Sequence, residues 1–240
     1  VRTTLLKMRS ITRSMRSITL YIAYLIDLFE KEKKSEIEDE ISLLTPVCKA
    51  WCTDEGFQIS VDAVQMHGGY GYCSEYGIEQ FVRDTKIATI YEGTNGIQSI
   101  DLVTRKILKD KGHSIGLFLT KVKADLKASS LTSHSETINH QVEKLEKVLE
   151  YFSQQQDINI VLQHTTQFLQ MFGNLVASWR LFVGASMAAE KISSVDKQEQ
   201  TFYQSKIDDL EVFCHLKLSE NSGIHDSILN SKFNITKMEL

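Results

Sequence analysis

Residues 90–98 read Ile-Tyr-Glu-Gly-Thr-Asn-Gly-Ile-Gln, and this stretch decides how the rest of the chain is interpreted. Glu92 follows two apolar residues and directly precedes a glycine and a new helical pattern. A carboxylate held against apolar walls is favoured in its neutral form, which is the property of a general base near neutral pH. Gly93 lets a ligand approach the backbone, and Thr94 and Asn95 are good helix N-cap residues. The alternative, on these residues alone, is a capped helix start with a solvated glutamate.

A glycine-rich segment lies upstream, where residues 65–72 read Gln-Met-His-Gly-Gly-Tyr-Gly-Tyr. Three glycines in four residues predict that a helix cannot continue and that the chain turns. Exposed backbone amides at such a turn admit a pyrophosphate or a flat ring. The spacing is not that of a Rossmann dinucleotide fingerprint, and no strand precedes it. Alone, such a segment is most often only a turn; together with the Glu92 segment it indicates a site.

These segments, within the run from Leu44 to Leu108, resemble the C-terminal helical domain of the acyl-CoA dehydrogenases. The resemblance rests on Val-Gln-Met-His-Gly-Gly-Tyr-Gly-Tyr (64–72), Arg-Asp-Thr-Lys-Ile (83–87) and the stretch at 90–98. Later residues, such as Phe-Leu-Gln-Met-Phe-Gly (168–173) and Trp179, are similar to a subfamily with an added C-terminal helical region. That subfamily includes 3-methylmercaptopropionyl-CoA dehydrogenases.

The resemblance implies an all-α fold, an up-and-down helical bundle with an added helical region. Residues 1–112 would form the flavin- and substrate-binding domain without its first helix, and residues 113–240 would form the added domain. The chain begins at Val1 inside a helical pattern, and five basic residues occupy its first sixteen positions. Positive charge opposes the dipole at a helix N-terminus. We therefore expect this chain to be a fragment of a longer protein.

Hydrophobic periodicity predicts the individual helices. The first carries a stripe from Met8 to Phe29, and a second is expected over 35–66 with a kink at Pro46. Further helices are expected at 78–82 and at 95–109, where Lys111 and Gly112 follow as the closing residues. Beyond them we expect a polar loop at 129–136, helices at 137–152, 158–192 and 197–218, and a polar tail. The helix at 158–192 carries a stripe of Phe168, Phe172, Leu175, Trp179, Phe182 and Ser186.

The resemblance also implies a reaction, in which Glu92 removes the α proton of an acyl-CoA thioester while a hydride leaves the β-carbon for the N5 atom of FAD. The Glu92 amide and a flavin ribityl hydroxyl would bind the thioester oxygen. Further flavin contacts are implied for Gln65, Met66, His67, Gly68, Gly69, Thr94, Asn95 and Gly96, the first five from a neighbouring subunit. Tyr91 and Gly93 would line the acyl thioester. Electrons would pass to an electron-transfer flavoprotein, and a homodimer or larger assembly is implied.

Composition excludes several other classes. The net charge is −4, and residues 113–240 hold twelve Lys and Arg against fifteen Asp and Glu, which disfavours nucleic acid as a partner. No run of eighteen apolar residues suits a stable membrane insertion, although the basic first helix keeps contact with a membrane surface as an alternative. Four cysteines make no disulfide framework, so we expect a reducing, cytoplasmic location. Cys48 and Cys52 lack partners for a metal site, and none is predicted.

Two alternatives stay open at this point. Within the enzymes, an acyl-CoA oxidase would use the same residues and pass electrons to oxygen. The chain could instead be a non-catalytic helical interaction or assembly module. As the domains that supply most of the flavin site have no counterpart here, we expect the isolated chain to be inactive. Arg83 and Asp84 are expected to form an ion pair that ties the turn to the bundle.

Overall fold

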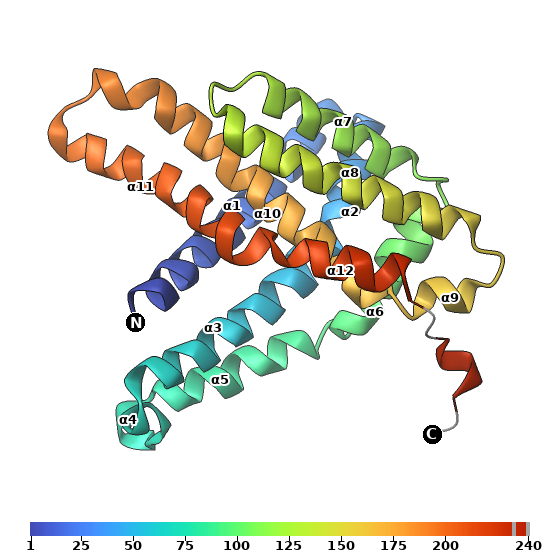
Figure 1. Cartoon of the computed structure of the whole chain (residues 1–240), viewed down its shortest axis with the longest axis horizontal. Coiled ribbons are helices and arrows are strands. Elements are labelled where there is room, and N and C mark those ends of the chain that lie inside the picture. The colour runs from blue at the N-terminus through green and yellow to red at the C-terminus, as the bar shows by residue number, and fades with distance from the viewer. Residues whose placement is uncertain (232–233, 239–240) are drawn as a thin grey trace.

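The computed structural model describes residues 1–231 and 234–238, and within them the chain forms helices and no strand (Figure 1). The α-helices are α1 (Arg2–Glu32), α2 (Ser35–Pro46), α3 (Cys52–His67), α4 (Gly69–Tyr72), α5 (Ile78–Lys86), α6 (Asn95–Asp101), α7 (His113–Lys127), α8 (Thr132–Gln154), α9 (Ile158–Leu162), α10 (Thr165–Lys191), α11 (Lys197–Phe213) and α12 (Glu220–Leu229). Three π-helical segments are η1 (Val47–Trp51), η4 (Leu102–Leu108) and η6 (Cys214–Leu218). The 3-10 turns are η2 (Ser74–Tyr76), η3 (Ile87–Thr89), η5 (Ile192–Ser194) and η7 (Ile235–Lys237). The all-α prediction is confirmed.

Helix α1 forms as its apolar stripe predicts. Ile11, Ile18, Ile22 and Leu25 are buried and belong to the hydrophobic core. The stripe packs against α2, α10 and α11. The helix therefore meets the bundle with its apolar face, and its partly exposed Arg9 and Arg13 form ion pairs with Asp209 of α11.

Pro46 divides the second predicted helix without ending it. The helical backbone continues from α2 through the π-helical η1 into α3. Proline lacks an N–H and its ring clashes with the carbonyl four residues earlier, so the regular α-helical bonding cannot be kept there. The expected kink is therefore met by a π-helical stretch that sets the direction in which α3 leaves the core.

The glycine-rich segment turns at a single residue. Gly68 has φ 60° and ends α3, so the predicted turn is confirmed, and Gly69 and Gly71 lie inside the short helix α4 that follows it. Gly71 is required for packing, since a Cβ there would lie 2.5 Å from the Val64 carbonyl oxygen. Gly68 is thus needed for its positive φ, and Gly71 is needed because it packs closely against the backbone of α3.

The second half of the chain departs further from the predicted helices. Helix α7 was not expected, and α8 starts at Thr132, so most of the loop predicted at 129–136 is helical. The helix predicted at 158–192 is broken at Gln163 and His164 into α9 and α10. Helix α12 lies in the predicted polar tail, whose residues 232–233 and 239–240 fall outside the described part of the chain.

Helix α10 lies at the centre of the molecule and contacts α1, α6, α8, α11 and α12. Its predicted stripe is confirmed, with Phe168, Phe172 and Trp179 among its fully buried side chains. The indole of Trp51, from η1, lies over Gly173 and donates a hydrogen bond of 2.9 Å from its Nε1 to the Asn174 Oδ1. This contact locks the region before residue 112 onto the region after it.

Replacing Gly173 by Ala is expected to destabilise the fold by about 1–3 kcal/mol, because the added methyl overpacks a rigid and buried site. Its Cβ would lie 2.3 Å from the Trp51 Cδ1 atom. Urea unfolding followed by tryptophan fluorescence measures the change. Gly184→Ala is the matched control on the same helix, where nothing lies within 4 Å of the added atom. Equal stability of the two variants would contradict the interlock.

Candidate functional site

The site predicted from sequence lies on a helical hairpin that projects from the bundle. Helices α3 and α5 lie side by side, with α4 at the tip and α6 at the base (Figure 1). The Thr85 hydroxyl donates to the Ser60 hydroxyl at 3.2 Å and joins the two arms. Helix α5 alone, with 9 residues at about 1.5 Å each, separates the tip from the Glu92 loop by about 14 Å. One chain therefore does not bring the glycine turn and Glu92 together.

The Glu92 loop has an unusual backbone. Glu92 has φ 57° and Gly93 has φ 85°, so two consecutive residues lie in the left-handed region. That region costs a non-glycine residue roughly 1–2 kcal/mol, and it is often found where a backbone is held for function. The Gln98 side chain donates to the Glu92 carbonyl oxygen at 3.2 Å, and Thr94 caps α6 by accepting from the Ile97 amide at 3.4 Å. The loop is thus held from its C-terminal side.

The side chain of Glu92 is exposed, and the expected apolar walls are not closed around it. Ile90 and Tyr91 are 50% and 54% exposed. The expectation that Glu92 is desolvated by its own neighbours is therefore wrong for this chain. The physical reason is that these neighbours are themselves at the surface, so closure needs atoms from elsewhere.

Asn95, the first residue of α6, is the anchor of the loop. Its Nδ2 donates to the Ala50 carbonyl oxygen at 3.1 Å and to the Asp54 Oδ1 at 2.8 Å, and its Oδ1 accepts from the Lys49 Nζ at 2.7 Å. Thr53 completes the set, its Oγ1 accepting from Nδ2 at 2.9 Å. The Asn95 side chain is thus occupied in fixing α6 to η1 and α3. Only the backbone of Asn95 is left for the predicted contact with flavin.

Lys49 is a functional candidate that sequence reasoning missed. Burial lowers its pKa, while the negative charges of Asp54 and Glu92 act in the opposite direction. The ammonium group thus lies within electrostatic reach of Glu92 as well as hydrogen-bonded to Asn95. Lysine at the surface of a helix gives no signal by itself, and only the tertiary contact with residue 95 identifies it.

A small cavity lies directly behind the anchor. It has a volume of about 250 Å³ and is lined by residues of four segments, among them Asn95 and Ser99 from α6 and Thr166 from α10. The Ser99 hydroxyl contacts the hydroxyls of Thr165 and Thr166, each at 3.3 Å. Helix α6 is therefore held to the centre of the bundle by polar contacts as well as by packing.

The glycine turn presents backbone rather than side-chain chemistry. The His67 ring is hydrogen-bonded through Nδ1 to the Ala63 carbonyl oxygen at 2.8 Å within its own helix. Gln65, Gly68 and Gly69 are exposed, and nothing lies within 4 Å of a Cβ built on either glycine. This open backbone fits a flat or phosphorylated group approaching the tip. Among the described residues no ion pair joins Arg83 to Asp84, so that expectation is wrong; Asp84 accepts from Gln80 instead.

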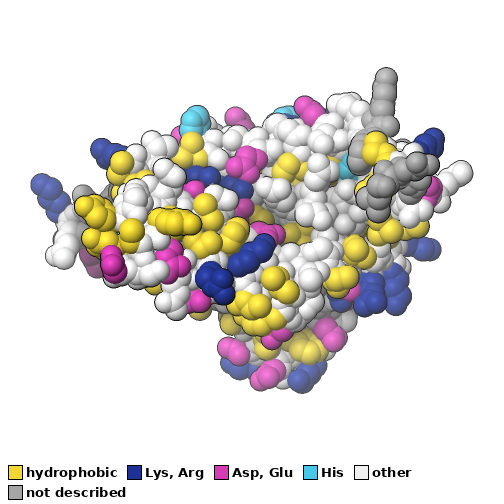
Figure 2. Space-filling view, turned by 90° about the horizontal axis from the view of Figure 1, so that it is seen from below, with side chains coloured by type: hydrophobic (Ala, Val, Ile, Leu, Met, Phe, Trp, Pro, Cys, Tyr) yellow, Lys and Arg dark blue, Asp and Glu magenta, His cyan; other side chains and the backbone are white. Residues whose placement is uncertain are grey.

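Hydrophobic side chains are exposed along the hairpin and its base. Seen from below, the face toward which the hairpin projects shows hydrophobic side chains among charged ones (Figure 2). Those exposed by a third or more are Val61, Tyr70, Tyr72, Tyr76, Phe81, Ile87, Ile90, Tyr91, Ile97 and Ile100. Such a dense set of exposed apolar residues marks a surface made for contact.

Clusters of metal-binding side chains and membrane-spanning helices are two further kinds of feature that would indicate function. No group of three metal-binding side chains gathers within residues 1–231 and 234–238, and the four cysteines are free thiols. No helix in those ranges is both long enough and apolar enough to cross a bilayer. The hairpin itself presents a carboxylate at Glu92, open backbone at the glycine turn and exposed apolar side chains.

Comparison with known proteins assigns the family. The family model described as Acyl-CoA dehydrogenase, C-terminal domain, matches residues 1–108, and that described as Acetyl-CoA dehydrogenase C-terminal like matches residues 118–239. A 3-methylmercaptopropionyl-CoA dehydrogenase from Ruegeria pomeroyi is 30% identical over 96% of this chain and 41% of its own length. The chain spans about two-fifths of the length of the curated relatives it matches.

Solved structures show the same fold. An acyl-CoA dehydrogenase from Bacillus anthracis, complexed with FAD, superposes with a TM-score of 0.75 at 19% identity, over 97% of this chain and 42% of that one. ACDH-11 from Caenorhabditis elegans, in complex with C11-CoA, superposes with a TM-score of 0.67 at 20% identity, over 96% of this chain and 40% of that one. The two family models cover nearly the whole sequence between them, and the chain therefore belongs to the acyl-CoA dehydrogenase family.

Proposed function

We propose that this chain is the C-terminal part of an FAD-dependent acyl-CoA dehydrogenase in which Glu92 is the catalytic base. The observation that carries the proposal is the backbone at Glu92 and Gly93, held in the left-handed region and anchored through Asn95. Strain of this kind is kept where the surrounding structure demands it. Residues 1–112 would be the flavin and substrate domain, and residues 113–240 the added domain, with the boundary at Gly112, where φ is 77°.

The proposed reaction places an α,β double bond in an acyl-CoA thioester. The Glu92 carboxylate takes the α proton, and its backbone amide donates a hydrogen bond to the thioester oxygen, which stabilises the negative charge that develops there. Bound flavin supplies the acceptor for the hydride that leaves the β-carbon. Tyr91 and Gly93 line the thioester in this proposal. Proton and hydride leave adjacent carbons, so the substrate loses two hydrogens and no other atom.

The proposed cofactor contacts come from two parts of the hairpin. Thr94, Asn95 and Gly96 contact FAD at the base, Asn95 through its backbone because its side chain is occupied. Residues 65–69 provide the FAD contacts at the tip. Because about 14 Å of α5 lies between them, we propose that the tip serves the flavin of a second subunit. The distance supports a homodimer or larger assembly. The proposal further names electron-transfer flavoprotein as the electron acceptor and the cytoplasm as the location, where free thiols persist.

The isolated 240-residue chain is expected to bind FAD weakly or not at all and to show no dehydrogenase activity. The reason is that Glu92 and its apolar neighbours stand open to solvent in this chain. Flavin titration monitored by fluorescence quenching, with dye reduction by acyl-CoA, measures both. Tight flavin binding with dye reduction would overturn this expectation.

Measurements on the complete protein separate the remaining classes. Dye reduction by an acyl-CoA together with electron transfer to electron-transfer flavoprotein supports the dehydrogenase. Oxygen consumption at a comparable rate would indicate an acyl-CoA oxidase instead. If the complete protein bound no flavin and size-exclusion chromatography showed only assembly, it would be a helical interaction module.

A further inference from the structure

A basic groove lies between α1, α10 and α11. We define it by Arg13, Arg16, Tyr24, Arg180, Phe202 and Lys206. Two adjoining cavities of about 690 and 250 Å³ share Arg13, Arg180, Phe202 and Lys206 in their walls. None of these residues is among those proposed to contact flavin or thioester. Their combined size lies in the range of small-molecule sites.

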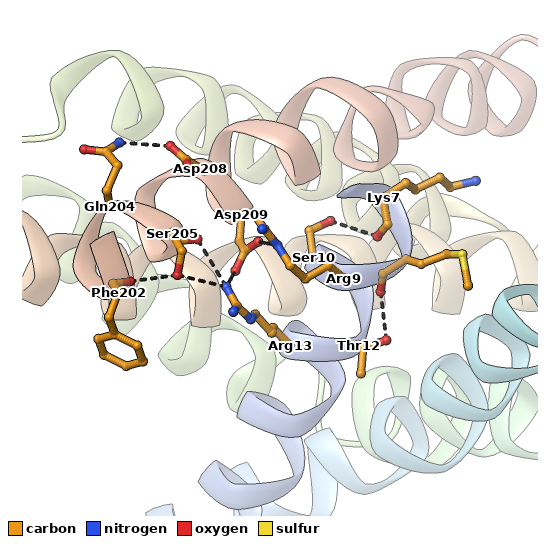
Figure 3. Close-up of polar contacts among 11 residues, drawn as sticks. Lys7, Arg9, Ser10, Thr12, Arg13, Phe202, Gln204, Ser205, Asp208 and Asp209 are labelled. Atoms are coloured by element: carbon orange, nitrogen blue, oxygen red, sulfur yellow. Dashed lines mark hydrogen bonds and ion pairs between the residues drawn. The ribbon is translucent and has the colours of Figure 1, made fainter. Parts of the chain in front are cut away.

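Charge in the groove is unbalanced. Asp209 is the one acid among the residues that line the two cavities, and its side chain is 1% exposed. It is already neutralised, because it accepts from the Arg9 Nε at 2.7 Å and from Arg13 (Figure 3). Arg13 also donates to the Ser205 hydroxyl at 3.2 Å, which fixes its guanidinium at the groove wall.

Two other cations of the groove are without an ion-pair partner in the described part of the chain. Among the described residues no ion pair involves Arg16 or Lys206. Burial lowers the pKa of Lys206, and the positive charges of Arg13 and Arg16 also lower it, while the negative charge of Asp209 acts in the opposite direction. Cations that repel one another in this way are stabilised by an anion bound between them.

The floor of the groove holds an unsatisfied donor. The Nε atom of Arg180 is buried and has no hydrogen-bond partner. The guanidinium itself lies 4.2 Å from the centroid of the Tyr21 ring, which orients it. Buried donors without partners are rare and costly, and an acceptor from a ligand is one way to satisfy them.

Aromatic rings complete the groove. Phe202 and Tyr24 are 54% and 57% exposed and line the larger cavity, and the Lys206 Nζ lies 4.7 Å from the Phe202 centroid. Exposed rings next to Arg and Lys provide stacking surfaces for a flat base beside donors for its phosphates. Residues 113–240 carry a net negative charge, which disfavours the long polyanion of a nucleic acid.

We propose that this groove binds a phosphorylated purine nucleotide, with its phosphates against Arg16, Lys206 and Arg180 and its base against Phe202 or Tyr24. Two sources share this chemistry, a free nucleotide such as ADP and the nucleotide end of coenzyme A. Binding of ADP does not depend on the proposed dehydrogenase function, whereas the coenzyme A source rests on it.

The test is isothermal titration of the 240-residue chain with ADP, coenzyme A, pyrophosphate and adenosine. We expect ADP and coenzyme A to bind more tightly than pyrophosphate, adenosine to bind least, and all phosphate-dependent binding to weaken with salt. Tighter binding of coenzyme A than of ADP identifies the cofactor end as the source, and the reverse identifies the free nucleotide. Equal binding of adenosine and ADP, or tighter binding of duplex DNA than of ADP, would overturn the proposal.

Variants locate the binding. Arg16→Gln with Lys206→Gln is expected to weaken ADP binding at least about tenfold, the loss of two charge-assisted contacts. These residues make no ion pair, so the thermal midpoint should change little. The matched control is Arg105→Gln with Lys147→Gln, a pair of exposed basic residues outside both cavities. An unchanged affinity in the groove variant, or an equal loss in the control, refutes the site.

Discussion

In the complete enzyme, Glu92→Gln is expected to lower turnover by at least about a hundredfold while flavin stays bound. A positioned general base contributes roughly a hundredfold to ten-thousandfold, and here no other carboxylate is proposed to reach the α-carbon. Glutamine keeps the size of the side chain and leaves the left-handed backbone at 92 unchanged. Stopped-flow reduction of the flavin by an acyl-CoA measures the step directly.

The control for this variant is Glu75→Gln, an exposed carboxylate near the tip of the hairpin. It should reduce flavin at the normal rate. The flavin absorbance spectrum of each purified variant shows that cofactor is retained. Normal turnover by Glu92→Gln would remove Glu92 from its proposed role, and loss of flavin would show that the residue acts in binding instead.

Replacing Lys217 by Met is expected to destabilise the fold by about 3–5 kcal/mol, the largest stability effect that the structure predicts. Lys217, from η6, lies 2.6 Å from the Glu55 Oε1 and 2.8 Å from the Glu220 Oε2. The Lys217 and Glu55 side chains are 7% and 9% exposed. Removing the Lys217 ammonium leaves the buried Glu55 carboxylate without a compensating charge. The loss of stability is therefore far larger than that caused by breaking an ion pair at the surface.

The pH dependence of that loss has a definite sign. Burial raises the pKa of Glu55 despite the nearby ammonium, and loss of Lys217 raises it further. The folded variant then binds a proton more readily than the unfolded chain. Its stability therefore falls as pH rises through the window between the unfolded and the raised folded pKa of Glu55. Chemical unfolding at pH 5 and pH 8 should show the larger deficit at pH 8.

A double replacement distinguishes a lost ion pair from lost packing. Glu55→Leu combined with Lys217→Met removes both charges from the interior, and apolar replacements of this kind are often neutral or stabilising. We expect it to recover most of the stability. Lys147→Met, at an exposed position, is the surface control. A double variant as unstable as Lys217→Met would show that the packing of the lysine stem, not its charge, carries the effect.

The spacing of apolar residues was sufficient to predict those helices whose formation depends on one segment of the chain. The stripe of α1 and that of α10 were visible as apolar residues at helical spacing, and both are buried. Helix α7 was missed although Ile115, Leu119, Val122 and Leu126 follow the same spacing and are buried. The signal was present there, but no side-chain cap marks where this helix begins.

The parts that could not be predicted depend on contacts between distant segments. Nothing in the sequence pairs Glu55 with Lys217, and nothing aims Lys49 at Asn95. The exposure of Glu92 was missed for the same reason, since apolar neighbours in sequence do not close a site unless they are also buried. The residues proposed for flavin and thioester stay predictions.

The Trp51–Gly173 interlock limits how this protein can be recombined. Two family models meet near residue 112, and a protein engineer would place a crossover there to build a chimaera from two relatives. The indole and the glycine that receives it lie on opposite sides of that crossover. If one relative supplied Trp51 and the other supplied a residue larger than glycine at position 173, the two side chains would clash. Both positions therefore have to come from the same relative.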